Sequence, residues 1–139
     1  SAKLGFPMDA LFAFGLGCDM ISIAREAMLS IGCIQAQRCH TGHCPTGVAT
    51  HNKWLMRGLD PTLKAARLAN YIVTLRHEIL KLCKAAGFSH PAFVTTDHFE
   101  LLDGQLGSTS FKETFGYELV RQSPEETDCS KIIDIMSAS

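Results

Sequence analysis

The chain has 139 residues, of which 46% are hydrophobic and 19% charged. This composition is typical of one ordinary globular domain, and the chain is too short for a whole α/β barrel, which takes about 250 residues. Its 13 basic and 14 acidic residues give a net charge of -1, which argues against nucleic acid as the main partner. The longest apolar stretch, residues 8–28, is interrupted by four charged residues, so we predict no membrane span or signal peptide and expect a cytoplasmic protein.

The first predicted elements are a helix, a strand and a helix. Residues 7–16 predict a short helix with Pro7 near its first turn, and glycines end it. Residues 18–23, which contain two isoleucines, have the length of a buried parallel strand, and a second short helix is expected from 25 to 30. A single strand has no partner for its backbone hydrogen bonds. We therefore expect the rest of the sheet to come from an N-terminal region or from another chain.

A loop and a long helix are predicted next. Residues 32–52 contain repeated glycine and proline and few large aliphatic side chains, which indicates a loop. Asp60-Pro61 is typical of a helix start and Gly87 of a helix stop. Between them, apolar residues recur at steps of three and four and predict one buried stripe. Its members are Leu68, Ile72, Leu75, Ile79, Leu82 and Ala86.

The C-terminal part carries weaker signals. We expect a short extended piece at residues 92–96, a turn of helix at 97–102 and another at 111–117. From Glu118 the chain becomes polar, and we expect it to be disordered or loosely packed. The predicted organisation has four parts, at residues 1–31, 32–52, 53–117 and 118–139.

Three of the six cysteines, Cys33, Cys39 and Cys44, fall within twelve residues. An odd, tight trio cannot pair off in disulfides, so a metal or cluster is the better explanation. Three thiolates suit a 3Fe-4S cluster, whereas a 4Fe-4S cluster would need a fourth ligand. Zinc could use the same cysteines with His40 or His43, although zinc ligands typically come in closely spaced pairs.

The remaining cysteines and the histidines are interpreted as structural. Cys18, Cys83 and Cys129 are scattered, and we expect them to behave as small buried apolar residues. His40 and His43 have no carboxylate nearby in the loop, so we expect them to orient the loop or to hydrogen-bond to cluster sulfur rather than to catalyse. No catalytic residue is predicted.

The cysteine motif resembles a known family. The runs Gly32-Cys33, Cys39-His40-Thr41, Cys44-Pro45 and Gly47-Val48-Ala49 are similar to the cluster loop in the flavin domain of glutamate synthase and of stand-alone FMN-binding glutamate-synthase-like proteins. The resemblance covers roughly residues 5–117, and extends to Leu16–Met20, Gly58–Pro61 and Asn70-Tyr71.

This resemblance implies an α/β parent protein, a (β/α)8 barrel that binds FMN. Such an enzyme converts 2-oxoglutarate and ammonia derived from glutamine into 2-iminoglutarate and reduces it to L-glutamate, with electrons passed from a 3Fe-4S cluster to the FMN. The chain would be a mainly helical C-terminal fragment that carries the last barrel strand and the iron-sulfur loop, and alone it would be inactive.

The resemblance also implies site residues and partners. The implied cluster ligands are Cys33, Cys39 and Cys44. The residues implied near the flavin phosphate are Ala24, Arg25 and Glu26. The expected partner is the remainder of its own barrel, or another chain that covers the open strand edge. The alternative is a zinc-binding or metal-free helical module with a structural or interaction role.

Overall fold

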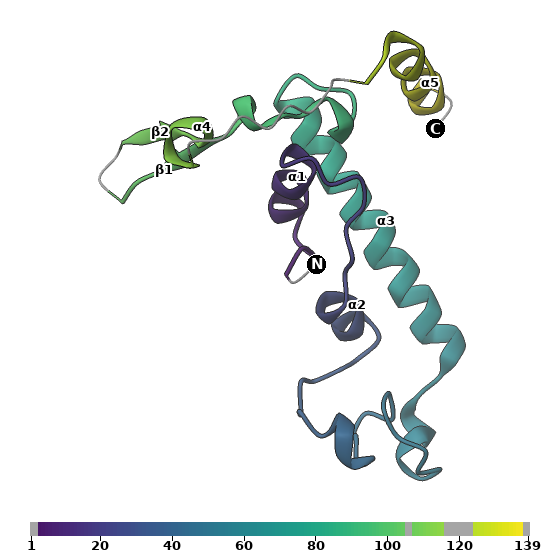
Figure 1. Cartoon of the computed structure of the whole chain (residues 1–139). Coiled ribbons are helices and arrows are strands. Elements are labelled where there is room, and N and C mark those ends of the chain that lie inside the picture. The colour runs from purple at the N-terminus through teal and green to yellow at the C-terminus, as the bar shows by residue number, and fades with distance from the viewer. Residues whose placement is uncertain (1–2, 105–106, 116–123, 138–139) are drawn as a thin grey trace. The chain divides into compact units, whose positions relative to one another are not determined.

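The computed structural model describes residues 3–104, 107–115 and 124–137 (Figure 1). These residues are mainly helical, with one small antiparallel sheet. The α-helices are α1 (Pro7–Gly15), α2 (Arg25–Ser30), α3 (Pro61–Ala85), α4 (Phe111–Phe115) and α5 (Glu126–Ser137). The 3-10 helices are η1 (Cys39–Thr41), η2 (Leu55–Gly58), η3 (Pro91–Phe93) and η4 (Thr96–His98). The strands are β1 (Glu100–Leu102) and β2 (Ser108–Ser110).

The chain divides into two compact units. One, here called the cysteine unit, comprises residues 1–5 and 22–76. The other, here called the core unit, comprises residues 6–21 and 77–139. Helix α3 contributes its N-terminal part to the first and its C-terminal part to the second.

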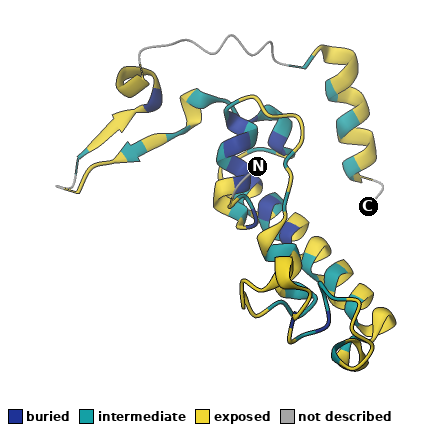
Figure 2. Cartoon of the chain, turned by 60° about the horizontal axis from the view of Figure 1, so that its bottom comes forward, coloured by how far each residue is buried: buried dark blue, intermediate teal, exposed yellow. Residues whose placement is uncertain are grey.

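The core unit is built around α1. Pro7 fits the first turn, where an amide hydrogen has no partner in the helix, and Asp9 complements the positive end of the helix dipole. One face of α1 is buried, and Phe12 packs its ring edge-on against Phe99 at 5.2 Å and Phe111 at 5.8 Å between ring centroids. Figure 2 shows buried residues on α1 and on the C-terminal part of α3. The buried apolar residues of this unit are Ala10, Leu11, Ala13, Ile79, Cys83, Val94 and Phe111.

Helix α3 begins and ends where its capping residues predict. The Oδ1 atom of Asp60 accepts hydrogen bonds from the backbone N–H groups of Thr62 at 2.9 Å and Leu63 at 3.3 Å. Gly87 follows the helix with a φ of +87°, and its N–H donates to the Lys84 carbonyl at 3.0 Å.

The predicted stripe of α3 is correct in part. Leu75 and Ile79 are buried, but Ile72 is 46% exposed and Ala86 is exposed. Tyr71 is half-buried. Neighbouring residues of a helix are rotated by about 100°, so a face that includes Tyr71 turns Ile72 outward.

Residues 18–23, predicted as a barrel strand, form no strand in the described part of the chain. The Cys18 N–H donates to the Ala13 carbonyl at 3.1 Å, and Met20 is 88% exposed. A strand exists only through hydrogen bonds to a neighbour. The pairing of these residues in a barrel therefore stays a prediction, and the expectation that Cys18 is buried is wrong because this thiol is exposed.

Between α3 and β1 the extended piece predicted at 92–96 is confirmed only at Val94 and Thr95, whose backbone is extended. Residues 91–93 form η3 instead, because Pro91 fits the first position of a helical turn and His90 Nδ1 accepts a hydrogen bond from the Ala92 N–H at 3.1 Å. The turn of helix expected at 97–102 is confirmed only at its start, in η4.

The C-terminal elements differ from the predictions for this part of the chain. Strands β1 and β2 pair antiparallel, and the predicted helix at residue 111 is α4 as far as residue 115. The tail predicted to be disordered contains α5, whose first turn carries acidic residues and whose Lys131 Nζ donates to Asp128 Oδ1 at 3.0 Å. The rest of these predictions, at 116–123 and 138–139, lies outside the described residues. No helix of the described part is long and apolar enough to cross a membrane.

Candidate functional site

The cysteine loop, residues 32–52, connects α2 to the segment before α3, and its backbone is locally unusual. Gln35 and Gln37 have φ values of 56° and 55°, a left-handed conformation that costs a non-glycine residue roughly 1–2 kcal/mol. Such residues persist only where their surroundings hold them, and they gather at ligand sites. Both glutamines, which lie between Cys33 and Cys39, therefore hold a strained backbone.

Cys44 has the environment of a stabilised thiolate. Its side chain is 7% exposed, and its Sγ shares a hydrogen bond with Thr46 Oγ1 at 3.3 Å. Hydrogen bonds from the Thr46 hydroxyl and from the backbone amides of Ala49, Thr46 and Val48 lower the pKa of Cys44 to about 7, against a smaller opposing effect of burial. Thiolates are the form in which cysteines bind metal.

The other two cysteines of the trio are more open. Cys33 is half-buried, and its Sγ accepts a hydrogen bond from the Gln35 N–H at 3.4 Å, whereas Cys39 is exposed within η1. In the described residues no three His, Cys, Asp or Glu side chains come together closely enough to hold a metal ion. The assignment of Cys33, Cys39 and Cys44 as cluster ligands therefore stays a prediction.

Hydrogen bonds within the loop involve Thr41 and His43. Thr41 Oγ1 donates to the Arg38 carbonyl at 2.8 Å, and His43 Nδ1 lies 2.8 Å from the Thr41 carbonyl oxygen. The ring of His43 is thus tied to the loop backbone, as expected of an orienting residue. His40 is exposed in η1.

Gly47 brings the cysteine loop close to the backbone of η2. Its φ is +78°, and a Cβ atom there would lie 2.6 Å from the Leu55 carbonyl oxygen and 3.1 Å from Met56 Cα. Only glycine satisfies both the left-handed backbone and this contact.

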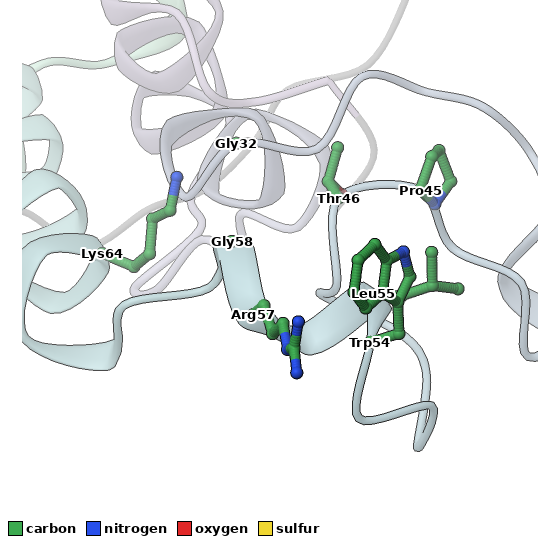
Figure 3. A pocket seen from close by; sticks show the side chains of 8 residues that line it. All are labelled: Gly32, Pro45, Thr46, Trp54, Leu55, Arg57, Gly58 and Lys64. Carbon is green, nitrogen blue, oxygen red and sulfur yellow. The ribbon is translucent and has the colours of Figure 1, made fainter.

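A hollow of about 470 Å³ lies between the cysteine loop and the start of α3 (Figure 3). The Arg57 guanidinium lies 4.6 Å from the centroid of the Trp54 ring, which is 70% exposed. Lys64 extends toward Gly32, where its Nζ would lie 2.9 Å from an added Cβ atom. The lining residues are Gly32, Pro45, Thr46, Trp54, Leu55, Arg57, Gly58 and Lys64.

The sequence pattern indicated no role for Trp54, Arg57 or Lys64, which line this hollow. The available signal was the spacing of Trp54 and Arg57, because residues three apart lie on one face of a helical turn.

The residues predicted near a flavin phosphate lie at the start of α2. Ala24 and Arg25 are exposed, and Ala24 makes no side-chain cap. The side chain of Glu26 fills the space beside Gly5. Burial, and to a smaller extent the charge of Glu26, raises the pKa of Tyr71, whose hydroxyl donates to the Gly5 carbonyl at 2.9 Å. A phosphate contact by these residues stays a prediction.

Comparisons with known proteins agree on one family. The family model described as the conserved region in glutamate synthase matches residues 1–89. The glutamate synthase large subunit-like protein YerD of Bacillus subtilis is 41% identical over 98 residues, which are 70% of this chain and 19% of that protein. An archaeal glutamate synthase [NADPH] of Methanocaldococcus jannaschii is 42% identical over 81 residues, 58% of this chain and 16% of that protein.

A plant protein also matches. The chloroplastic ferredoxin-dependent glutamate synthase 2 of Arabidopsis thaliana is 30% identical over 114 residues, 82% of this chain and 6% of that protein. The chain thus spans less than a fifth of the length of each of these three relatives. No solved structure matches it.

Proposed function

Since the chain belongs to the glutamate synthase family, we propose that it is the C-terminal portion of a flavin and iron-sulfur oxidoreductase that forms L-glutamate from 2-oxoglutarate and glutamine-derived ammonia. In this proposal the cysteine loop holds a 3Fe-4S cluster, and FMN binds in the parent barrel. The chain alone is inactive, because catalysis on a barrel draws residues from the ends of several strands.

The observation that carries the proposal is the environment of the Cys44 sulfur. A thiolate that binds iron benefits from hydrogen-bond donors around it, since these offset its charge and tune the cluster potential. A cysteine that served only as a small apolar residue would need none of these donors.

The bound cluster would supply one-electron transfer to the flavin. The chain's own residues would perform three tasks. The sulfurs of Cys33, Cys39 and Cys44 would each hold one iron, and the amide donors would stabilise their negative charge. The close contact at Gly47 would keep the loop against η2.

We also propose a place for residues 18–23 and a partner for them. In the parent protein they would form the last strand of a (β/α)8 barrel, between α1 and α2. Helix, strand and helix in this order are the closing unit of such a barrel. The partner that would supply the neighbouring strands is the remainder of the barrel.

The test uses the whole encoded protein and single Cys→Ser substitutions at positions 33, 39 and 44. Each should remove the cluster and stop reductant-dependent formation of glutamate from 2-oxoglutarate and glutamine. Cys83→Ser is the matched control, because this thiol is fully buried in the core unit and makes no part of the loop. It should keep the cluster and cost only about 1–3 kcal/mol of stability.

Iron and sulfide analysis together with the electron paramagnetic resonance signal of the cluster gives the readout. A trio variant with a full cluster would show that the ligand assignment is wrong. Zinc without iron in protein prepared without air would favour the zinc-binding alternative.

A further inference from the structure

The hydroxyl of Thr46 lies beside the most shielded cysteine of the loop. Its Oγ1 is 3.3 Å from the Cys44 Sγ, close enough for a hydrogen bond to sulfur. Cys44 is 7% exposed, whereas Cys33 is half-buried and Cys39 is exposed. A sulfur that is shielded from water depends on protein donors to stabilise its negative charge. A single hydroxyl therefore has more effect at Cys44 than it would have at the two more open cysteines.

The direction of this hydrogen bond depends on the state of the sulfur. While Cys44 is a thiol, either atom could be the donor. A thiolate carries no proton, so the Thr46 hydroxyl must donate once Cys44 is ionised. The same holds when the sulfur binds a metal, because the thiolate is the form that binds. The hydroxyl hydrogen of Thr46 is then directed at the ligand sulfur.

Thr46 differs in this respect from the other donors of the loop. The Cys33 Sγ accepts a hydrogen bond from the Gln35 N–H at 3.4 Å, which is a backbone donor. Thr41 and Thr50, the other threonines of the loop, donate to backbone carbonyl groups. In the described part of the loop, the side chain that donates to a cysteine sulfur is therefore that of Thr46, and it can be removed by substitution.

We propose that Thr46 acts through Cys44 and raises the reduction potential of the iron-sulfur centre by donating its hydroxyl hydrogen to the ligand sulfur. The inference rests on the proposed function and adds to it a positioning residue that sets how readily the centre accepts an electron. In this step the centre gains one electron from an external one-electron reductant. No bond forms or breaks, and the Thr46 hydroxyl keeps its proton.

The sign of the effect follows from charge. An added electron increases the negative charge on the thiolate sulfurs, so a hydroxyl donor stabilises the reduced centre more than the oxidised centre. At a shielded sulfur this difference acts in a low effective dielectric and is weakened little by water. Loss of the Thr46 hydroxyl should therefore lower the reduction potential. A purely structural role of Thr46 in the loop predicts loss of the centre instead.

The test uses the whole encoded protein and the variant Thr46→Val, which keeps the shape of the side chain and removes the hydrogen bond. The centre is titrated with dithionite at controlled potential and followed by its electron paramagnetic resonance signal. At the midpoint potential of the parent, the ratio of reduced to oxidised centre should fall about tenfold in Thr46→Val, which corresponds to about 59 mV for one electron. Its iron content should be unchanged. Thr46→Ser retains a hydroxyl and should restore the midpoint of the parent.

The matched control is Thr50→Val. It removes another hydroxyl of the loop, one that donates to the Gly42 carbonyl and not to a sulfur. Its midpoint potential should equal that of the parent, because its hydrogen bond serves the loop backbone.

Three results would overturn the proposal: an unchanged midpoint in Thr46→Val, an equal shift in Thr46→Ser, or an equal shift in Thr50→Val. Loss of the centre in Thr46→Val but not in Thr46→Ser would assign the hydroxyl to assembly and would overturn it as well. A parent protein that binds no iron contradicts the proposed function itself. Any of the other results in a parent with its full iron content contradicts only the role of Thr46.

Discussion

Leu75 and Ile72 offer a direct test of the buried face of α3. Both belong to the stripe predicted from spacing, yet Leu75 is 7% exposed and Ile72 is 46% exposed. Substitution by alanine in the 139-residue chain should therefore have unequal effects.

The magnitudes follow from burial. Leu75→Ala removes three carbons from a closed environment, at about 0.8 kcal/mol each plus a cavity term, so a loss of about 3 kcal/mol is expected. Ile72→Ala removes carbons that are already half in water, and alanine gains a few tenths of a kcal/mol in helix propensity, which leaves a loss below about 1 kcal/mol. The difference of about 2 kcal/mol is a large part of a typical domain stability of about 5–15 kcal/mol.

The assay is urea unfolding followed by circular dichroism at 222 nm. With a slope of about 1–3 kcal/mol per molar urea, the midpoint of Leu75→Ala should lie roughly 1 M below that of Ile72→Ala. Equal midpoints, or the reverse order, would show that the face of α3 is assigned wrongly.

The remaining predictions address the loop, the cap and the fragment. Gly47→Ala should prevent cluster insertion in the whole protein, measured by iron content, because the added Cβ atom would collide with the Leu55 carbonyl. The control Gly42→Ala, at φ +72° in open space, should cost only about 1–2 kcal/mol of stability and keep the iron. Asp60→Ala should lower the free energy of unfolding by about 0.5–2 kcal/mol, whereas Asp60→Asn should lower it little because asparagine caps a helix equally well. Equal losses of stability for the two variants in urea melts would contradict the capping role. The 139-residue chain supplied with FMN, glutamine, 2-oxoglutarate and reductant should form no glutamate, and measurable turnover would refute the need for the other barrel strands.

The sequence predicted elements whose signals are local. α1 and the two ends of α3 follow from proline, aspartate and glycine acting on their own backbone neighbours. Residues 18–23 show the limit, because a strand is defined by its neighbour and the chain contains no pairing strand for them among the described residues. The polar composition after Glu118 favours disorder, yet a helix begins at Glu126 because acidic residues in the first turn stabilise it.

The candidate site was predictable in kind but not in geometry. Cysteine spacing predicted a metal loop, whereas the donors around the Cys44 sulfur depend on how residues 46–49 turn back toward it. The reach of Lys64 toward Gly32 brings together residues from separate segments, which no local pattern reveals.

Trp54 is the only tryptophan of the chain and lies in the wall of the hollow beside the cysteine loop. In the 139-residue chain its intrinsic fluorescence therefore reports on this one place. An iron-sulfur cluster absorbs broadly and would quench the emission by energy transfer. Loading of the cysteine loop with metal could thus be followed in real time in the unlabelled chain.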